Sequence, residues 1–368
     1  MTKTDFCFSQ KKINFVPYKK EMRLSKPIKL LTAAILLFVT IFAASKMPGI
    51  AEWYVENIYP LIAAVFSFVS SLFPFSLFDV FTVAAPLALL VLIVLMILRK
   101  VKWSKGLYII ARSVLLLVAW FYFAWGFAYF RKDFYERCNI RKSEYNAENF
   151  SAFAKKFIDD ANSAYIDLKS IDKDDINRKI ELQYEKLKDV LKIKYPNGKR
   201  KSKRMLYESL HTKTGVSGYF GPFFNEIHVN GFVLDFEYPF TLAHEKAHQF
   251  GVASEAECNL YAFITCATGD DAQLRYSAYI STIIYVLNNY AAIFPDDYKN
   301  LLATVDSKII EDIKTMSKHW TEARNQTLSN AQRAVYDTYL KTNRINSGIK
   351  NYSEVVNLLI SSYNTLVK

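Results

Sequence analysis

Long stretches without charge in the first third of the chain constrain the fold more than any other feature. They cover about residues 30–46, 80–98 and 107–130. Lys29 and Lys46 flank the first stretch and Arg112 interrupts the third, and such long side chains can reach the water interface from a helix end. Because a helix needs roughly 20 apolar residues to cross a bilayer, these stretches predict three membrane-spanning helices.

A fourth apolar stretch, about residues 58–76, contains the run Leu61–Phe73 between Pro60 and Pro74. A helix over Leu61–Phe73 would be only about 20 Å long, which is short of a hydrocarbon layer of about 30 Å. We therefore expect this stretch to lie in the interface or to re-enter the membrane. If it crossed instead, the side on which the following residues lie would reverse.

The distribution of Lys and Arg predicts the orientation. Residues 1–29 and the loop 99–105 are strongly basic, whereas the residues between the first two spans carry mostly acidic groups. The positive-inside rule then predicts a basic cytoplasmic tail over 1–29, a membrane domain over 30–130 and an extracytoplasmic domain over 131–368. Ala43-Ala44-Ser45 also fits a signal-peptidase site, but the long basic region favours an uncleaved anchor.

Charge and cysteine usage limit the classes of partner. The net charge of +12 suits anionic lipid or cell-wall polymers. No recognition motif accompanies this charge, so we expect a lipid bilayer and no nucleic acid among the partners. The four cysteines form no CxxC pair, and Cys258 and Cys266 lie too far apart on one predicted helix to bridge. We expect Cys258 to be a buried core residue.

One motif carries recognisable chemistry, the His-Glu-x-x-His within Thr241-Leu-Ala-His-Glu-Lys-Ala-His-Gln-Phe-Gly251. On a helix, His244 and His248 lie one turn apart on the same face, where both can bind one Zn²⁺ ion. Glu245 is then placed to take a proton from a water molecule on the metal. Gly251 suits the end of this helix. The alternative is an amphipathic helix with two surface histidines.

A catalytic zinc site needs a third protein ligand. Ser254 stands where the extended motif HExxHxxGxxH has a histidine, but Ser254 and Glu257 form a capping box that starts a second helix. Here the sequence resembles the gluzincins, whose third ligand is a glutamate on a second helix. The resemblance places Glu255 in the ligand position and Asn259 one turn later, where it could orient a ligand histidine. Glu257 remains an alternative ligand.

The resemblance extends to a particular family. Several segments outside the motif are similar to domain-of-unknown-function 3810, a family of zincin-like bacterial membrane proteins: Ile58-Tyr-Pro, Phe73-Pro-Phe-Ser, Trp125-Gly, Ser217-Gly-Tyr-Phe-Gly-Pro-Phe, Glu226-Ile-His-Val-Asn, Tyr339-Leu-Lys and Asn351-Tyr-Ser. The similarity runs from about residue 30 to the end. It implies a membrane-anchored zinc peptidase of gluzincin type, without indicating a substrate. The expected fold is mainly α: transmembrane helices, then a mostly helical zincin-like domain with a small β-sheet or hairpin.

The segment Ser217–Phe236 is the one convincing β region. Resemblance to gluzincins implies that it forms an edge strand beside the metal helix, where a substrate backbone adds as a further strand. His228 in this segment could stabilise an oxyanion, or it could be an ordinary polar strand residue. Tyr219 and Tyr276 are weaker candidates for the same role.

Elsewhere the pattern is helical. Asn146–Tyr165 and Asp174–Tyr195 have helical periodicity, and the basic run Lys199–Arg204 is expected to be a solvated loop. Tyr276–Pro295 is uncharged, but its Ser, Thr and Asn residues predict a buried core helix and not a fourth span.

The leading functional hypothesis is a membrane-anchored zinc metallopeptidase acting on a peptide or protein substrate outside the cytoplasm. His244, His248 and Glu255 would bind Zn²⁺, and Glu245 would activate water. Two alternatives remain, a non-catalytic zinc-binding membrane sensor and a cell-envelope structural protein.

Overall fold

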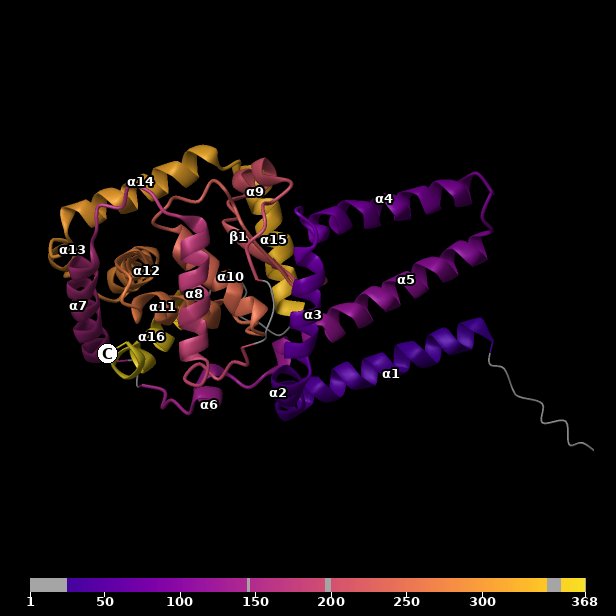
Figure 1. Ribbon diagram of the computed structural model, residues 1–368, viewed down its shortest axis with the longest axis horizontal. Coiled ribbons are helices and arrows are strands. Elements are labelled where there is room, and N and C mark those ends of the chain that lie inside the picture. Colours follow the sequence, from indigo (N-terminus) through magenta and orange to yellow (C-terminus); the bar gives the residue numbers. More distant parts are fainter. Residues whose placement is uncertain (1–24, 144–145, 196–199, 343–351, 368) are drawn as a thin grey trace, which may run out of the picture.

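The computed structural model describes residues 25–143, 146–195, 200–342 and 352–367. Within these ranges the protein is mainly helical and has a two-stranded antiparallel sheet, which confirms the expected fold class. Three long helices extend from one side of a rounded helical body (Figure 1). Most of the predicted basic tail, residues 1–24, lies outside the described residues.

Three helices of the described chain are long and apolar enough to cross a membrane, namely α1 (Lys26–Lys46), α4 (Leu77–Ile97) and α5 (Trp103–Ala124). Most of their apolar side chains are exposed, as in helices that face lipid. The third span was predicted to continue to residue 130, but the helix ends at Ala124. Trp125 leaves the helical conformation, with φ −165°, and Gly126–Phe130 form the short 3-10 helix η1.

Two short helices connect α1 to α4, α2 (Pro48–Asn57) and α3 (Tyr59–Ser71). In Figure 1, α3 runs across the ends of the long helices, along the helical body. The Tyr59 hydroxyl at one end of α3 donates to the Gln249 carbonyl at 2.7 Å, and the Ser70 hydroxyl at the other end donates to Glu226 at 2.7 Å. Because both ends contact the same body, α3 does not pass to the far side of the spans.

The helical body contains the remaining helices, most of which pack around a central group of three. Their bounds are α6 (Phe134–Cys138), α7 (Ala147–Ala164), α8 (Lys173–Leu187), α9 (Glu208–Thr214), α10 (Tyr238–Gln249), α11 (Glu255–Ala267), α12 (Ala272–Ile293), α13 (Tyr298–Leu302), α14 (Ser307–Ala323), α15 (Gln326–Thr342) and α16 (Tyr352–Leu366). The central three are α10, α11 and α12. Nearly all residues of α10 and α11 are buried, and so are half of those of α12.

Two helix predictions can be compared directly with these bounds. Helix α12 packs against α7, α10 and α11, so the uncharged stretch after residue 276 belongs to the core, as predicted. Helix α8 ends at Leu187, earlier than the predicted Tyr195, because the chain turns and Lys192 adopts a positive φ of 50°.

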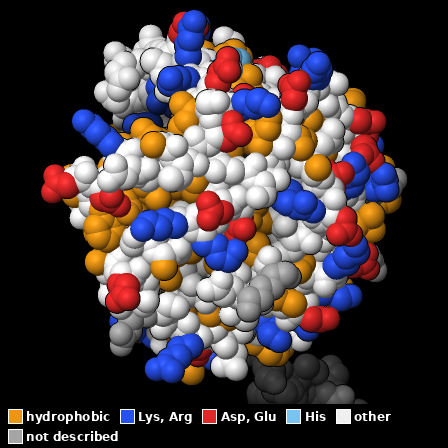
Figure 2. Space-filling view, turned by 90° about the vertical axis from the view of Figure 1, so that its left-hand side faces the viewer, with side chains coloured by type: hydrophobic (Ala, Val, Ile, Leu, Met, Phe, Trp, Pro, Cys, Tyr) orange, Lys and Arg blue, Asp and Glu red, His pale blue; other side chains and the backbone are white. Residues whose placement is uncertain are grey.

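On the face opposite the long helices, side chains of both charges are interspersed, as expected for a surface in water (Figure 2).

The sheet consists of β1 (Gly218–Gly221) and β2 (Glu226–Val229), with Gly218 opposite Val229 and Gly221 opposite Glu226. The predicted β region extended to Phe236, but regular pairing stops at Val229 and the chain turns into α10. Helix α10 packs against both strands, so the hairpin lies beside the His-Glu-x-x-His helix.

Candidate metal centre

Helices α10 and α11 are joined by a turn at Gly251. This glycine has φ 83°, a left-handed conformation that costs glycine little, and its N–H bonds to the His248 carbonyl at 2.9 Å. Three residues later, the Ser254 hydroxyl accepts a hydrogen bond from the Glu257 N–H and caps α11. The predicted end of the first helix is therefore present. Of the two hydrogen bonds in the predicted capping box, the one from the Glu257 N–H to the Ser254 hydroxyl is present. The turn brings the start of α11 back to the middle of α10.

The turn places two imidazoles and one carboxylate together. One donor atom from each of His244, His248 and Glu255 lies within 4.8 Å of the other two. Nε2 of His244 is 3.1 Å from Glu255 Oε2, and Nε2 of His248 is 3.4 Å from Glu255 Oε1. Ligands bound to tetrahedral zinc at about 2.0–2.1 Å are separated by about 3.3 Å, so the three groups fit zinc with little movement. A His₂Glu donor set is also one that catalytic zinc uses.

The Nδ1 atom of each imidazole has a hydrogen-bond partner, and this contact directs the Nε2 atom of the same ring at Glu255. Nδ1 of His244 lies 3.0 Å from Asn259 Oδ1, and Nδ1 of His248 lies 2.9 Å from the Val252 carbonyl oxygen. Such partners fix the tautomer and orientation of metal-binding imidazoles. The Asn259 side chain therefore lies at the His244 imidazole, the position that the resemblance implied. Burial alone would raise the pKa of Glu255, but the two imidazoles hold it well below its usual range.

Glu245 lies beside these three residues on α10 and is only 5% exposed. Burial raises its pKa to about 7, although the neighbouring imidazoles oppose this shift. Its Oε2 atom is buried and has no hydrogen-bond partner in the described protein, and Glu245 is one of the residues that line the cavity containing the histidines. A buried carboxylate beside a cavity can accept a proton from a molecule bound there.

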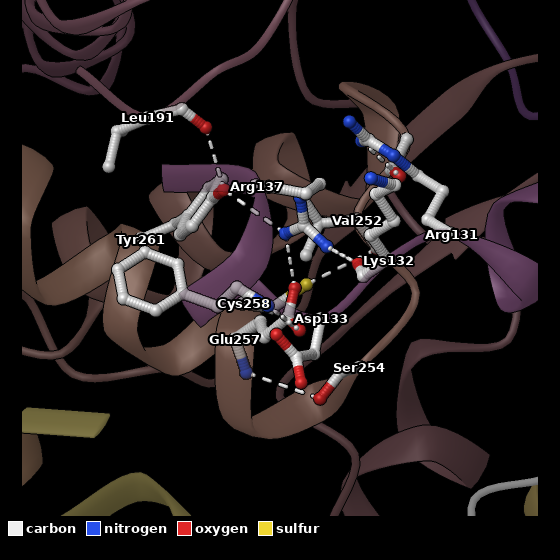
Figure 3. A network of polar contacts seen from close by, with 12 residues as sticks. Arg131, Lys132, Asp133, Arg137, Leu191, Val252, Ser254, Glu257, Cys258 and Tyr261 are labelled. Atoms are coloured by element: carbon white, nitrogen blue, oxygen red, sulfur yellow. Dashed lines mark hydrogen bonds and ion pairs between the residues drawn. The ribbon is translucent and has the colours of Figure 1, made fainter. Parts of the chain in front are cut away.

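Glu257, the alternative ligand, points into a different network (Figure 3). Its carboxylate forms an ion pair with Arg137 of α6 and accepts the Phe134 N–H at 3.1 Å. Arg137 also donates to the Tyr261 hydroxyl at 3.2 Å. The structure therefore brings Glu255, and not Glu257, to the two histidines. In the same region Cys258 is fully buried, as expected, and burial raises the pKa of its thiol to about 12.

Sequence reasoning missed Tyr336, which belongs to α15. Its hydroxyl donates to Glu255 Oε1, and its ring lines the cavity. Burial and the Glu255 carboxylate raise the pKa of this phenol, so it keeps its proton and remains a donor. No local sequence signal distinguishes Tyr336 from other tyrosines on polar helices, because only the fold brings α15 to α11.

His228 is not brought to the other predicted site residues. Its side chain is fully buried, its Nε2 lies 2.8 Å from the Ser76 hydroxyl, and it does not line the cavity. The ring of Tyr219 stacks on it at 4.3 Å and forms the cavity wall instead. Burial lowers the pKa of His228 to about 4. The oxyanion role suggested for His228 therefore has no support in the geometry, and Tyr276 binds Asp312 instead.

The membrane part of the chain holds the end of α10. The last carbonyl groups of a helix lack partners within the helix. Here the Trp125 indole donates to the His248 carbonyl at 2.8 Å, Tyr59 donates to Gln249, and Arg131 donates to the Gly251 carbonyl at 3.0 Å. Helix α10 is thereby fixed to Trp125 directly after α5, to Arg131 just beyond η1, and to Tyr59 of α3, which lies between the first two spans.

The opposite face of α10 is held by a buried ion cluster. Lys246 is fully buried and donates to Glu181 of α8, which also pairs with Arg200 at 2.7 Å. Burial alone would raise the pKa of Glu181, but the two cations lower it to about 2. The cluster accounts for a lysine inside the motif, since it anchors the helix and does not face the cavity.

The family comparison agrees with the resemblance noted in the sequence. A family model described as "Protein of unknown function (DUF3810)" matches residues 54–360, a range that begins within α2 and ends within α16. No curated protein and no solved structure matches the chain. The matched range contains α4, α5 and all four residues grouped at the centre. The chain belongs to the DUF3810 family.

Proposed function

We propose that this protein is a membrane-anchored, zinc-dependent metallopeptidase of gluzincin type that hydrolyses peptide bonds outside the cytoplasm. The observation that carries the proposal is the convergence of His244, His248 and Glu255 within 4.8 Å, beside the buried carboxylate of Glu245. A zinc ion held by these three residues would supply Lewis-acid chemistry at the substrate carbonyl and at water.

The chain's own groups account for the proton movements of hydrolysis. Glu245 would take a proton from the attacking water and deliver it to the departing amine nitrogen while the C–N bond breaks. One water is consumed, and the products are a carboxylate and an amine. Asn259 orients the His244 imidazole, and Tyr336 holds one oxygen of Glu255, so both are positioning residues.

The location outside the cytoplasm rests on charge. The basic loop between α4 and α5 lies at the end of the spans that is remote from the helical body, and so does the start of α1 (Figure 1). Under the positive-inside rule this remote end is cytoplasmic, which puts the metal centre on the other side.

The test combines two measurements on the full chain in vesicles. Zinc content and hydrolysis of a peptide mixture are measured for the wild type and for Glu245→Gln, with Glu136→Gln on the surface as the control for the same chemical change. We expect all three proteins to bind zinc and Glu245→Gln alone to lose hydrolysis. If the wild type binds zinc but cleaves no more than Glu245→Gln, the peptidase proposal fails and a zinc-binding sensor remains.

A further inference from the structure

The cavity at the metal centre is shared with the membrane helices. It has a volume of about 1440 Å³, above the range of about 300–1,000 Å³ that is usual for small-molecule sites. At one end it is lined by the four residues of the metal centre. At the other end it is lined by Phe78, Thr82 and Val83 of α4 and by Phe121 of α5.

Strand β1 connects the two ends of this cavity. A Cβ on Gly218, at its start, would lie 2.6 Å from Glu245 Oε1, and a Cβ on Gly221, at its end, would lie 2.8 Å from the Phe78 ring. With a rise of about 3.3 Å per residue, the four-residue strand covers about 10 Å from the candidate base to the first turn of α4. Among the described strands β1 pairs with β2 alone, and its residues Gly218, Tyr219 and Phe220 line the cavity, so an extended chain in the cavity can lie along this strand.

The start of α4 is fixed relative to this strand. The Glu226 carboxylate of β2 accepts the Phe78 N–H at 2.8 Å and the Leu77 N–H at 3.1 Å, and so caps the spanning helix. Asp79, also in the first turn, accepts the Tyr219 hydroxyl of β1. The distance between the metal centre and the membrane end of the cavity is therefore set by the fold.

From the cavity, an apolar surface continues along each spanning helix. On α4, Val83 is followed at helical spacing by Leu87 and Leu90, which are 57% exposed. On α5, Phe121 is preceded at the same spacing by Leu117 and Val114, which are also exposed. If the apolar anchor of a polypeptide lay in the lipid along the exposed face of α4 or α5, the polypeptide would leave the lipid at the mouth of the cavity.

We infer that the substrate is itself anchored in the membrane: a polypeptide that pairs with β1 in extended form while its apolar anchor lies against α4 and α5. This inference rests on the proposed peptidase function. Hydrolysis adds one water across a peptide bond about three residues from the point where the anchor enters the lipid, as the length of β1 sets the spacing. The anchor can be an acyl chain or a transmembrane helix, since both present the same apolar surface.

The experiment uses the full chain, loaded with zinc, in phosphatidylethanolamine–phosphatidylglycerol vesicles. The probe is a random peptide library of about twelve residues, long enough to reach beyond β1. It is offered in matched forms: acetylated, palmitoylated at either end, or fused to a polyleucine transmembrane helix. Mass spectrometry locates the cuts, and Glu245→Gln provides the background.

We expect at least one anchored form to be cleaved about tenfold faster than the acetylated form or more, because anchoring raises its local concentration. The cuts should fall within about three to five residues of the anchor. Equal rates with cuts at all distances would overturn the inference and leave the peptidase function intact. No cleavage above the Glu245→Gln background in any form would overturn both.

A pair of variants separates the cavity route from general attraction to the membrane. Val83→Trp obstructs the membrane end of the cavity, whereas Val80→Trp places the same side chain on an exposed position of α4 outside the cavity. Tryptophan is well tolerated near the membrane interface. We expect Val83→Trp to reduce cleavage of the anchored peptides to the acetylated rate, and Val80→Trp to leave it unchanged. Equal effects of the two variants would contradict the route through the cavity.

Discussion

The contact between Gly218 and Glu245 gives a prediction that separates catalysis from metal binding. In Gly218→Ala the new methyl group would lie 2.6 Å from Glu245 Oε1, whereas an ordinary contact begins at 3.4 Å. Glu245 must therefore move by about 0.8 Å, and a misplacement of about 1 Å can cost about a hundredfold in rate. Because the three ligands are untouched, we expect a loss of about tenfold to a hundredfold in kcat with zinc content unchanged.

The chain offers a matched control for this change. In Gly231→Ala the new methyl group would meet a second glutamate, Glu208, at 2.7 Å, but that carboxylate is on the surface helix α9 and can turn aside. Zinc per chain is measured by mass spectrometry and kcat by hydrolysis of the peptide library. Wild-type kcat in Gly218→Ala, or a loss of zinc, would refute the argument that β1 positions Glu245.

Three further changes test other parts of the structure. Arg137→Ala leaves the Glu257 carboxylate buried without its cation and should destabilise the fold by about 3–5 kcal/mol, measured as a lower Tm and denaturation midpoint. Tyr336→Phe removes the donor to Glu255 and should weaken zinc binding by about tenfold to a hundredfold, measured by competition with a chelator. Glu181 has a depressed pKa, about 2 in place of the usual 4.5, so its stabilising contribution is complete above pH 4.5 and is lost as the pH falls towards 2. The Tm of Glu181→Gln should accordingly fall less over this range than that of the wild type.

The Arg137→Ala prediction has a control variant, and the other two predictions each have a result that would contradict them. Lys132→Ala breaks the exposed Lys132–Glu136 pair and should leave Tm nearly unchanged, unlike the loss of Arg137. Wild-type zinc affinity in Tyr336→Phe would show that the phenol does not position the ligand. Parallel pH profiles for the wild type and Glu181→Gln would mean that the ion cluster under α10 does not contribute to stability.

Local sequence patterns predicted the elements of the site because short-range geometry determines them. The His244–His248 spacing, the Gly251 turn and the Ser254 cap each depend on a few neighbouring residues, and all three are present in the structure. The spans could likewise be predicted from composition, since the length of an apolar helix is a local property.

The remaining features of the site depend on contacts between residues that are far apart in the sequence, so local patterns could not predict them. Glu255 and Glu257 differ because Arg137, far away in the chain, takes Glu257 into an ion pair. The surroundings of His228 could not be predicted from the sequence, because they depend on distant residues such as Ser76, directly before α4. The Trp125 indole donates to the His248 carbonyl, a contact that exists only when the membrane part and the metal helix are packed together, so no local pattern predicts it.

The central claim is that two histidines and Glu255 hold one metal ion, and zinc stoichiometry tests it most directly. Purified wild type, Glu255→Ala and Glu257→Gln are loaded under the same metal-replete conditions, and zinc per chain is measured. The geometry predicts about one zinc per chain in the wild type and in Glu257→Gln, and a clear loss in Glu255→Ala. Full zinc content in Glu255→Ala, or none in the wild type, would contradict the account.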